Sequence, residues 1–278
     1  MGKISKIEYS IDSVVDKRIV LLTDLHYSSY KNRKKLNKVL EVLRNDKFDY
    51  ICIAGDFIDH SNINDMDCLI EWFKAIAALS KVFISLGGHD IVKGKKDKLY
   101  HYNEELYDNI KKIENIYILD NEVFEEEELR FIGLTLPLDY YYKYKENTNY
   151  FMRYVNNIFD GFDDKYNILL SHTPVPFTNL KTYSDVKLLK NIPLVLSGHT
   201  HAGIVPLFLR NKFKGRGIFA PCGNKMFPKD TYGLIKRFNT NIIISSGVTK
   251  VSKSKPFSFL DSFFDIEITY INLKRKSN

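Results

Sequence analysis

The chain has 278 residues, of which 44% are hydrophobic and 27% charged, and its formal net charge is +7. This composition is that of a soluble globular protein and excludes a disordered or fibrous one, and no apolar run approaches the roughly 18 residues of a membrane span. The three widely spaced cysteines, Cys52, Cys68 and Cys222, form neither a disulfide framework nor a paired zinc motif, so we expect a reducing compartment.

The N-terminus, MGKISKIEYS, lacks the apolar segment of a signal peptide. As given, the chain is expected in the cytoplasm, and membrane association is the alternative if the natural protein carries a further N-terminal anchor. The lysine-rich surface comes without a nucleic-acid-binding motif, so we expect no specific nucleic-acid partner. A positive field would still favour anionic substrates or an anionic membrane face.

Five apolar runs, each ending in a polar cluster, are typical of strands buried on both faces. They are RIVLLTDLH (18–26), DYICIAGDFID (49–59), KVFISLGGHD (81–90), YNILLSHTP (166–174) and IPLVLSGHTH (192–201). Helical periodicity separates the first three runs, over residues 32–44 and 66–79. This order predicts parallel strands joined by right-handed crossovers.

Later strand-like segments are separated by turn residues and predict a second, partly antiparallel sheet packed on the first. They are RFIGLTL (130–136), YGLIKRF (232–238), NIIISS (241–246) and FDIEITYINL (264–273), with FNTN (238–241) as a hairpin turn. No linker or repeat interrupts the chain, so we expect one domain over residues 1–278. The aromatic and lysine-rich segment 139–154 is predicted to be a helix at the sheet edge, with a lid or membrane-contacting flap as the alternative.

Five of the seven histidines follow predicted strands, and four aspartates share these positions: His26, His89, His172, His199 and His201, with Asp24, Asp56, Asp59 and Asp90. A lone histidine after a strand is usually structural. Five that converge on the carboxyl edge of a sheet, where open α/β folds build ligand sites, indicate a functional site.

The spacing of these residues fits metal ligation. In Asp24-Leu25-His26 and His199-Thr200-His201, alternate residues of an extended chain can reach one site. Mixed imidazole and carboxylate ligands suit Mn²⁺, Fe²⁺/Fe³⁺ or Zn²⁺ and not Ca²⁺. Because there are more ligands than one ion needs, we expect two divalent ions that share a carboxylate.

These motifs occur in a characteristic order: D-x-H (24–26), G-D-x-x-D (55–59), G-G-H-D (87–90), S-H (171–172) and G-H-T-H (198–201). In this the chain resembles the calcineurin-like metallophosphoesterases, which implies a four-layer αββα sandwich of two mixed β-sheets flanked by helices. The segments LSGHTHAGI, FPKDTYGL and NIIISSGV are similar to the ending of one bacterial branch, the YkuE/YaeI-like phosphodiesterases. That branch commonly carries an N-terminal anchor or export signal.

The resemblance implies a ligand set for a binuclear centre. The first metal would be held by Asp24, His26, Asp56 and His201, and the second by Asp56 as bridge with His172 and His199. A hydroxide that bridges the metals would attack phosphorus.

The other polar residues receive roles from the same resemblance. His89 would stabilise the transition state or protonate the leaving group, with Asp90 orienting its imidazole. Asp59 is either a partner of the site or a helix-capping residue. His60 and His101 match no motif and are expected at the surface.

Gly88 departs from the family's G-N-H-[DE] loop, whose asparagine is a ligand of the second metal. We therefore expect a weaker second metal position. The resemblance implies a phosphoesterase, with a phosphodiesterase as the expected kind, acting on a lipid-linked or nucleotide-type ester. A metal-poor scaffold that binds protein partners is the alternative. LPLDYYY and VPLFLRNKF favour an apolar or membrane-proximal substrate and a peripheral membrane contact, and the oligomeric state is left open.

Overall fold

The fold is described from a computed structural model of the chain. It describes residues 3–28, 30–59, 65–93, 99–101, 103–142, 155, 164–179, 191–220, 225–249 and 263–276. His60, Cys222 and most of the aromatic segment 139–154 lie outside these ranges, so the predictions made for them stay predictions. No helix among the described residues is long and apolar enough to cross a bilayer.

The first sheet has six strands in the order β1-β16-β2-β3-β4-β7. Its strands are β1 (Ile4–Ser13), β16 (Ile266–Arg275), β2 (Lys17–Leu22), β3 (Tyr50–Ala54), β4 (Lys81–Ser85) and β7 (Ile116–Ile118). Strands β2, β3, β4 and β7 are parallel, whereas β16 runs antiparallel to β2 and parallel to β1. The carboxyl ends of β2, β3 and β4 therefore lie at one edge of the sheet.

The second sheet also has six strands, in the order β14-β15-β11-β10-β9-β8. They are β14 (Gly233–Arg237), β15 (Thr240–Ile244), β11 (Leu194–Ser197), β10 (Tyr166–Ser171), β9 (Leu129–Leu134) and β8 (Val123–Glu126). The four inner strands are parallel, and each edge strand is antiparallel to its neighbour. The predicted hairpin turn is confirmed, since Arg237 pairs with Thr240.

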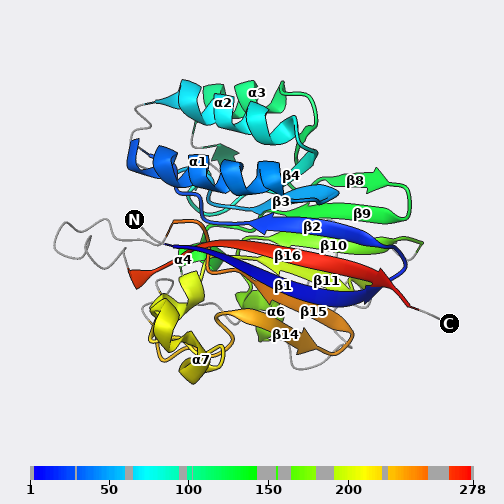
Figure 1. Ribbon diagram of the computed structural model, residues 1–278, viewed down its shortest axis with the longest axis vertical. Helices are drawn as coiled ribbons and strands as arrows, with labels where there is room; N and C mark the ends of the chain where they lie inside the picture. Colours follow the sequence, from blue (N-terminus) through cyan, green and yellow to red (C-terminus); the bar gives the residue numbers. More distant parts are fainter. Residues whose placement is uncertain are drawn as a thin grey trace.

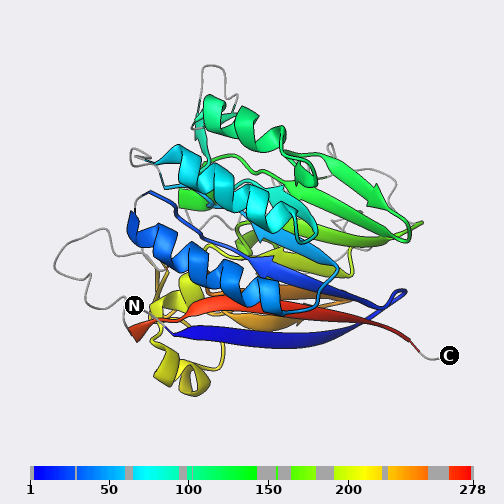
Figure 2. The same cartoon turned by 45° about the horizontal axis from the view of Figure 1, so that its top comes forward.

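Three helices cover the outer face of the first sheet, as Figures 1 and 2 show: α1 (Tyr30–Asn45), α2 (Met66–Ala77) and α3 (Glu104–Lys111). The remaining described helices are short: α4 (Asp139–Tyr142), α6 (Val175–Thr178), α7 (Arg210–Phe213), and the 3₁₀ helices η4 (His201–Ile204) and η5 (Leu207–Leu209). Two small antiparallel pairs complete the fold: β5 (Ile91–Lys93) with β6 (Leu99–His101), and β12 (Phe219–Ala220) with β13 (Lys225–Met226).

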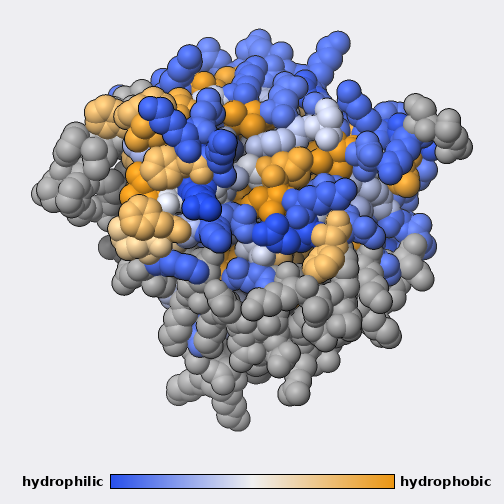
Figure 3. All heavy atoms as spheres, turned by 90° about the horizontal axis from the view of Figure 1, so that it is seen from below, coloured by the Kyte–Doolittle hydropathy of each residue, from blue (hydrophilic) through white to orange (hydrophobic). Residues whose placement is uncertain are grey.

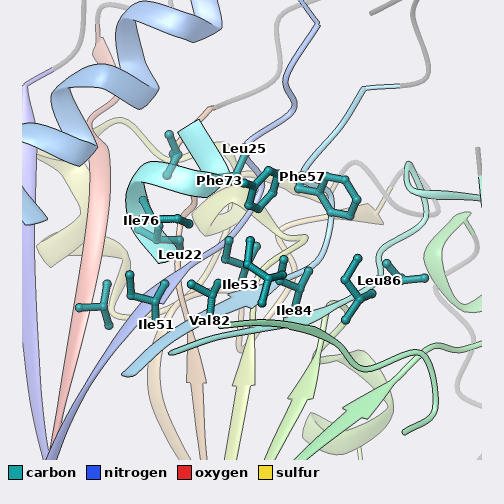
Figure 4. Packing of buried hydrophobic residues seen from close by; sticks show 14 of the residues in the cluster. Leu22, Leu25, Ile51, Ile53, Phe57, Phe73, Ile76, Val82, Ile84 and Leu86 are labelled. Atoms are coloured by element: carbon teal, nitrogen blue, oxygen red, sulfur yellow. The ribbon is translucent and has the colours of Figure 1, made fainter. Parts of the chain in front are cut away.

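Alternation along the strands divides the core into layers. On one face of the first sheet, Leu22, Ile53 and Ile84 point toward Phe73 and Ile76 of α2 (Figure 4). Each such side chain, when fully buried, contributes roughly 1.5–3 kcal/mol to folding.

The opposite face of the first sheet packs against the second sheet. Leu21 and Phe83 from the first sheet meet Phe131 and Leu170 from the second, and the Phe83 and Phe131 rings stack 3.9 Å apart. On its far side the second sheet buries Leu169, in the same cluster as Phe177 of α6. The αββα sandwich of two mixed sheets is therefore confirmed.

The placement of the C-terminal strand corrects one prediction. The sequence pattern assigns residues 264–273 to the second sheet, but β16 lies inside the first sheet, between β1 and β2. The strand is buried over most of its length, and a buried apolar run does not reveal which sheet will pair with it. Its partner β1 was missed because alternate residues of that strand face solvent at the sheet edge.

Candidate metal centre

Strands from both sheets contribute the predicted ligands. Asp24 and His26 follow β2 and Asp56 follows β3 in the first sheet, whereas His172 follows β10 and the His199–His201 pair follows β11 in the second. The expected convergence at strand ends thus occurs between two sheets. The loops are tied together by backbone hydrogen bonds from Asp24 to Gly55 (3.1 Å) and from His26 to Asp56 (2.9 Å).

Three groups of ligand atoms lie close enough to hold an ion each. Among the described residues they are Asp24-His26-His201, His26-Asp56-His89 and Asp56-His172-His199, with the ligand atoms of each group within 4.8 Å of one another. His26 and Asp56 each occur in two groups, so the three groups merge into one continuous site. Asp24, Asp56 and His172 in this site are almost completely buried.

The backbone of the ligand loops is strained. Five predicted ligands adopt the left-handed conformation that non-glycine residues avoid: Asp24 (φ 52°), His26 (φ 44°), Asp56 (φ 54°), His199 (φ 69°) and His201 (φ 46°). Each such residue costs on the order of 1–3 kcal/mol, and such strain persists where the surrounding fold imposes it, commonly at functional sites. The geometry of the site is therefore held at the expense of local stability.

The first group suits a cation better than it suits hydrogen bonds. Asp24 Oδ1 lies 3.7 Å from His26 Nε2 and 3.6 Å from His201 Nε2. These distances are too long for hydrogen bonds, but two atoms that each bind an ion at about 2.1 Å lie up to about 4 Å apart. Both ring nitrogens of the buried His26 lack a hydrogen-bond partner among the described residues. A shared cation would satisfy them.

The second group is tighter. His172 Nε2 lies 2.9 Å from Asp56 Oδ2 and 3.1 Å from His199 Nδ1. His172 Nδ1 lies 2.8 Å from the carbonyl oxygen of Ala54, so Nδ1 carries the proton and Nε2 faces the group as a ligand. His199 Nε2 is buried without a partner among the described residues. The residues of this group therefore also fit a divalent ion.

Without a cation, the site distributes protons unevenly. Burial alone would lower the pKa of His172, but the Asp56 carboxylate raises it to about 9. Burial, followed by the charge of His172, lowers the pKa of His199 to about 3. For Asp24 and Asp56, burial is outweighed by nearby histidine charges, and both pKa values lie below their ordinary range. A cation would displace the His172 proton, so binding should release a proton.

His89 lies at the rim of the centre. Its imidazole packs edge-on against His26 at 4.7 Å, and its side chain keeps 22% of its surface exposed. Its Nδ1 lies 3.3 Å from Asp59 Oδ1. His89 is therefore open to a ligand on one side and paired with a carboxylate on the other.

Asp90 takes a different place from the one predicted for it. Its carboxylate accepts hydrogen bonds from the backbone N–H groups of Asp56 (2.7 Å), Gly87 (2.8 Å) and Ile58 (3.1 Å). It therefore fastens the two ligand loops together. The sequence predicts that Asp90 orients the His89 imidazole, but the geometry favours Asp59. Asp59 does not cap α2, because the N-cap residue of that helix is Asp65.

Each glycine of the G-G-H-D loop occupies a position where a side chain would collide with a different neighbour. A Cβ on Gly87 would lie 2.2 Å from Asp56 Oδ1, so a side chain there would displace the shared carboxylate. A Cβ on Gly88 would lie 2.8 Å from Tyr141 Cβ. The Tyr141 hydroxyl accepts from the Leu136 N–H (2.9 Å) and donates to the Leu86 carbonyl (3.3 Å), which holds the ring in place.

Tyr141 and Tyr142 were not predicted as site residues. The Tyr141 ring lies 5.9 Å from the His172 ring and 6.1 Å from the His199 ring, so it forms a wall beside the second group. The Tyr142 hydroxyl donates to the Gly88 carbonyl at 3.1 Å. The only sequence signal for either residue was the aromatic run that follows LPL. That run gives no indication of which ring turns inward.

His101 is half-buried, although it was predicted at the surface. Its Nδ1 lies 3.3 Å from Glu104 and its Nε2 3.4 Å from Asp120, and its ring stacks on Tyr107. Both ring nitrogens are thus paired with carboxylates. This is an ion-pair cluster on β6, where His101 pairs with Ile91, the residue that follows the G-G-H-D loop.

Two mixed sheets with histidines and aspartates at their meeting strand ends define an α/β protein with a candidate metal site. The model of the calcineurin-like phosphoesterases matches residues 17–203, and the chain belongs to this family.

Two curated relatives have sequences that are 28% identical to the aligned part of this chain. A metallophosphoesterase of uncharacterised activity from Helicobacter pylori is 28% identical over 67% of this chain and 45% of its own length. One from Campylobacter jejuni is 28% identical over 94% of this chain and 60% of its own length. This chain therefore spans about half the length of these relatives. Among solved structures, the phosphopantetheinyl hydrolase of Mycobacterium tuberculosis is similar, with 11% identity and a TM-score of 0.41 over 82% of this chain and 88% of that one.

Proposed function

We propose that this chain is a binuclear metal-dependent phosphoesterase that acts as a phosphodiesterase. One observation carries the proposal: His26 and Asp56 each belong to two ligand groups, so that neighbouring cations would share a carboxylate. Mixed imidazole and carboxylate ligands favour Mn²⁺, Fe or Zn²⁺. When bound, two such ions would make a water nucleophilic at neutral pH and neutralise charge on the phosphoryl oxygens.

The chain's own residues would bind the ions, donate a proton to the leaving group and position the loops. Asp24, His26 and His201 would hold the first ion together with Asp56, and Asp56, His172 and His199 the second. His89, at the exposed rim, is placed to donate a proton from Nε2 to the leaving oxygen, while Asp59 keeps the other ring nitrogen protonated. Asp90 would act as a positioning residue through the backbone of both loops.

The substrate class is proposed from the sequence alone. The similarity of LSGHTHAGI and NIIISSGV to the YkuE/YaeI-like branch favours a phosphodiester, with a lipid-linked or a nucleotide-type ester as the two candidates. Comparing rates on a lipid phosphodiester in vesicles and on a cyclic nucleotide would separate these candidates.

Metal content and hydrolysis test the activity together. We expect purified protein to bind about two Mn²⁺ ions per chain and to hydrolyse bis-p-nitrophenyl phosphate in excess Mn²⁺. Phe238→Ser, in the exposed β14–β15 turn far along the chain from the ligand loops, is a matched control and should keep both properties. Fewer than about one bound ion together with no hydrolysis would refute the proposal.

Replacing His89 separates proton transfer from metal binding. We expect His89→Asn to lower kcat about 10²-fold with unchanged Mn²⁺ content, because its ring is a rim group and not part of either proposed ligand set. The slope of log rate against leaving-group pKa should steepen, because poor leaving groups depend most on a proton. A variant that loses metal instead would make His89 a ligand.

The second candidate is a scaffold of the same fold that binds protein partners and has lost catalysis. Gly88 favours it, because the glycine offers no ligand to the second metal position. The candidate predicts that the chain binds metal at most weakly and hydrolyses neither mono- nor diesters in excess Mn²⁺. The buried ring nitrogens of His26, which have no hydrogen-bond partner among the described residues, favour the enzyme.

A further inference from the structure

The segment between β11 and β14 carries an exposed apolar surface next to the metal centre. Leu207, Phe208, Met226 and Phe227 are 37%, 70%, 56% and 67% exposed. Five exposed basic residues belong to the same segment: Lys212, Lys214, Arg216, Lys225 and Lys229. We call these nine residues the α7 surface. Phe208 and Phe227 are the two most exposed large hydrophobic side chains among the described residues. Exposed apolar patches mark sites of interaction with a protein, a ligand or a membrane.

The α7 surface is built rigidly onto the ligand loop. The Phe227 N–H donates to the Ile218 carbonyl (3.0 Å), and the Ile218 N–H donates to the Gly203 carbonyl (2.8 Å). Gly203 and Gly217 touch so closely that a Cβ on Gly203 would lie 2.1 Å from the Gly217 Cα. Since Gly203 comes two residues after His201, whatever binds the α7 surface is held beside the metal centre.

The charged residues of this segment are basic with one exception. Between residues 205 and 231 the sequence contains a single acidic residue, Asp230, and its carboxylate is paired with Arg237. Figure 3 shows the face seen from below, with apolar groups next to hydrophilic ones on the side where Figure 1 places α7. A partner for this surface must therefore accept apolar side chains and supply negative charge.

The surface is also hollowed. A cavity of about 640 Å³ lies between α7 and β14, with Lys214, Asp230 and Leu234 among its lining residues. Cationic and apolar groups thus line one hollow next to α7, and the carboxylate of Asp230 in it is paired with Arg237. This combination suits a phosphate-bearing headgroup with an attached acyl chain.

We propose that the α7 surface docks on an anionic lipid bilayer. Phe208 and Phe227 would insert at the headgroup boundary, and the lysines would face the lipid phosphates. Apolar side chains and basic residues act together in interfacial binding, because insertion removes apolar area from water and the anionic leaflet attracts the cations. Resting on the proposed function, this contact would present a lipid-linked phosphate ester to the metal centre.

Vesicle binding tests the proposal without substrate or metal turnover. The full chain is sedimented with phosphatidylcholine vesicles that either contain or lack phosphatidylglycerol. We expect binding only to the anionic vesicles and release at high salt, because screening shortens the reach of the lysines. The double variant Phe208→Ser/Phe227→Ser should lower partitioning about tenfold or more. Phe238→Ser, also exposed but in the β14–β15 turn, should bind as the wild type does.

A second variant set guards against misfolding. Lys212→Gln/Lys214→Gln/Lys229→Gln alters only exposed side chains and should weaken binding about tenfold while the thermal midpoint stays unchanged. The proposal would be overturned if the chain bound neutral vesicles as well as anionic ones, or bound neither. It would also be overturned if Phe238→Ser lost as much vesicle binding as the Phe208→Ser/Phe227→Ser variant. Concentration-dependent dimers that Phe208→Ser disperses would also overturn it and assign the surface to a second copy. Because no hydrolysis is measured, the outcome is independent of the proposed activity.

Discussion

The two halves of the metal centre are alike in chemistry and different in surroundings. Each combines a carboxylate with two imidazoles: Asp24 with His26 and His201 in the first half, and Asp56 with His172 and His199 in the second. In the first half the ligand atoms stand 3.6–3.7 Å apart. In the second they are drawn together to 2.9–3.1 Å.

The second half is also bounded by an aromatic wall. The Tyr141 ring stands beside His172 and His199 and takes the space that a side chain at position 88 would need. The lesson is that Gly88 is matched to its surroundings, because the ring that excludes its side chain is buried and hydrogen-bonded at its hydroxyl. We therefore expect a first cation position that binds tightly and a second that binds weakly.

The largest effect is expected where the halves meet. Asp56→Asn should remove tight binding at both positions and lower kcat/KM by at least about 10³-fold, because Asp56 belongs to the second half and its Oδ2 also lies 3.8 Å from His26 Nε2 of the first half. Metal content by mass spectrometry and the rate on bis-p-nitrophenyl phosphate measure this. If one ion is retained at full affinity, Asp56 is not shared and the two halves are independent.

Removing one ligand from each half tests their inequality. We expect His201→Ala to lose the tighter ion and His199→Ala only the weaker one, each with a loss of affinity of about 10²-fold. Calorimetric titration of the metal-free protein with Mn²⁺ resolves the two steps. Identical titrations for the two variants would mean that the aromatic wall has no influence on affinity.

The Gly88–Tyr141 contact can be broken from either side. Gly88→Ala should lower the free energy of unfolding by roughly 1–3 kcal/mol, because its Cβ would overlap the stem of the tyrosine. The penalty should largely vanish in a Tyr141→Gly background, which removes the Tyr141 Cβ that the new methyl group would meet and serves as the matched control. Gly88→Asn alone should likewise be destabilised and should not strengthen the second position. Equal penalties in both backgrounds would show that the strain lies elsewhere.

The smallest effect is expected at His101, which differs from the histidines of the metal centre because both of its ring nitrogens have carboxylate partners. Burial lowers its pKa, but the hydrogen bonds with Asp120 and Glu104 outweigh this and raise it above 6.5. The stabilisation by charged His101 is therefore complete below the unfolded-state value and is lost as pH rises through the higher folded-state value. Chemical unfolding of wild type and His101→Gln should differ by up to about 1 kcal/mol at pH 5.5 and by less at pH 8.5. Added Mn²⁺ should leave this difference unchanged.

Local sequence patterns predicted much of the fold. The continuous apolar runs and the helical periodicity between them placed β2, β3, β4, α1 and α2, because each is buried and its pattern is unambiguous. Strands β1, β7 and β8 were missed, since they are short or half-exposed and their alternation is weak. The sheet membership of β16 depended on long-range pairing, about which its own residues say nothing.

The sequence by itself determined which side chains stand at the strand ends, because the order and spacing of Asp24, His26, Asp56, His172 and His199 follow directly from the chain. The tertiary structure decided how they are used. It brought the edges of two sheets together, set Asp59 against His89, and moved Asp90 to the backbone of the ligand loops. It also placed Tyr141 against Gly88. Such contacts join residues far apart in sequence, and only packing in three dimensions selects among them.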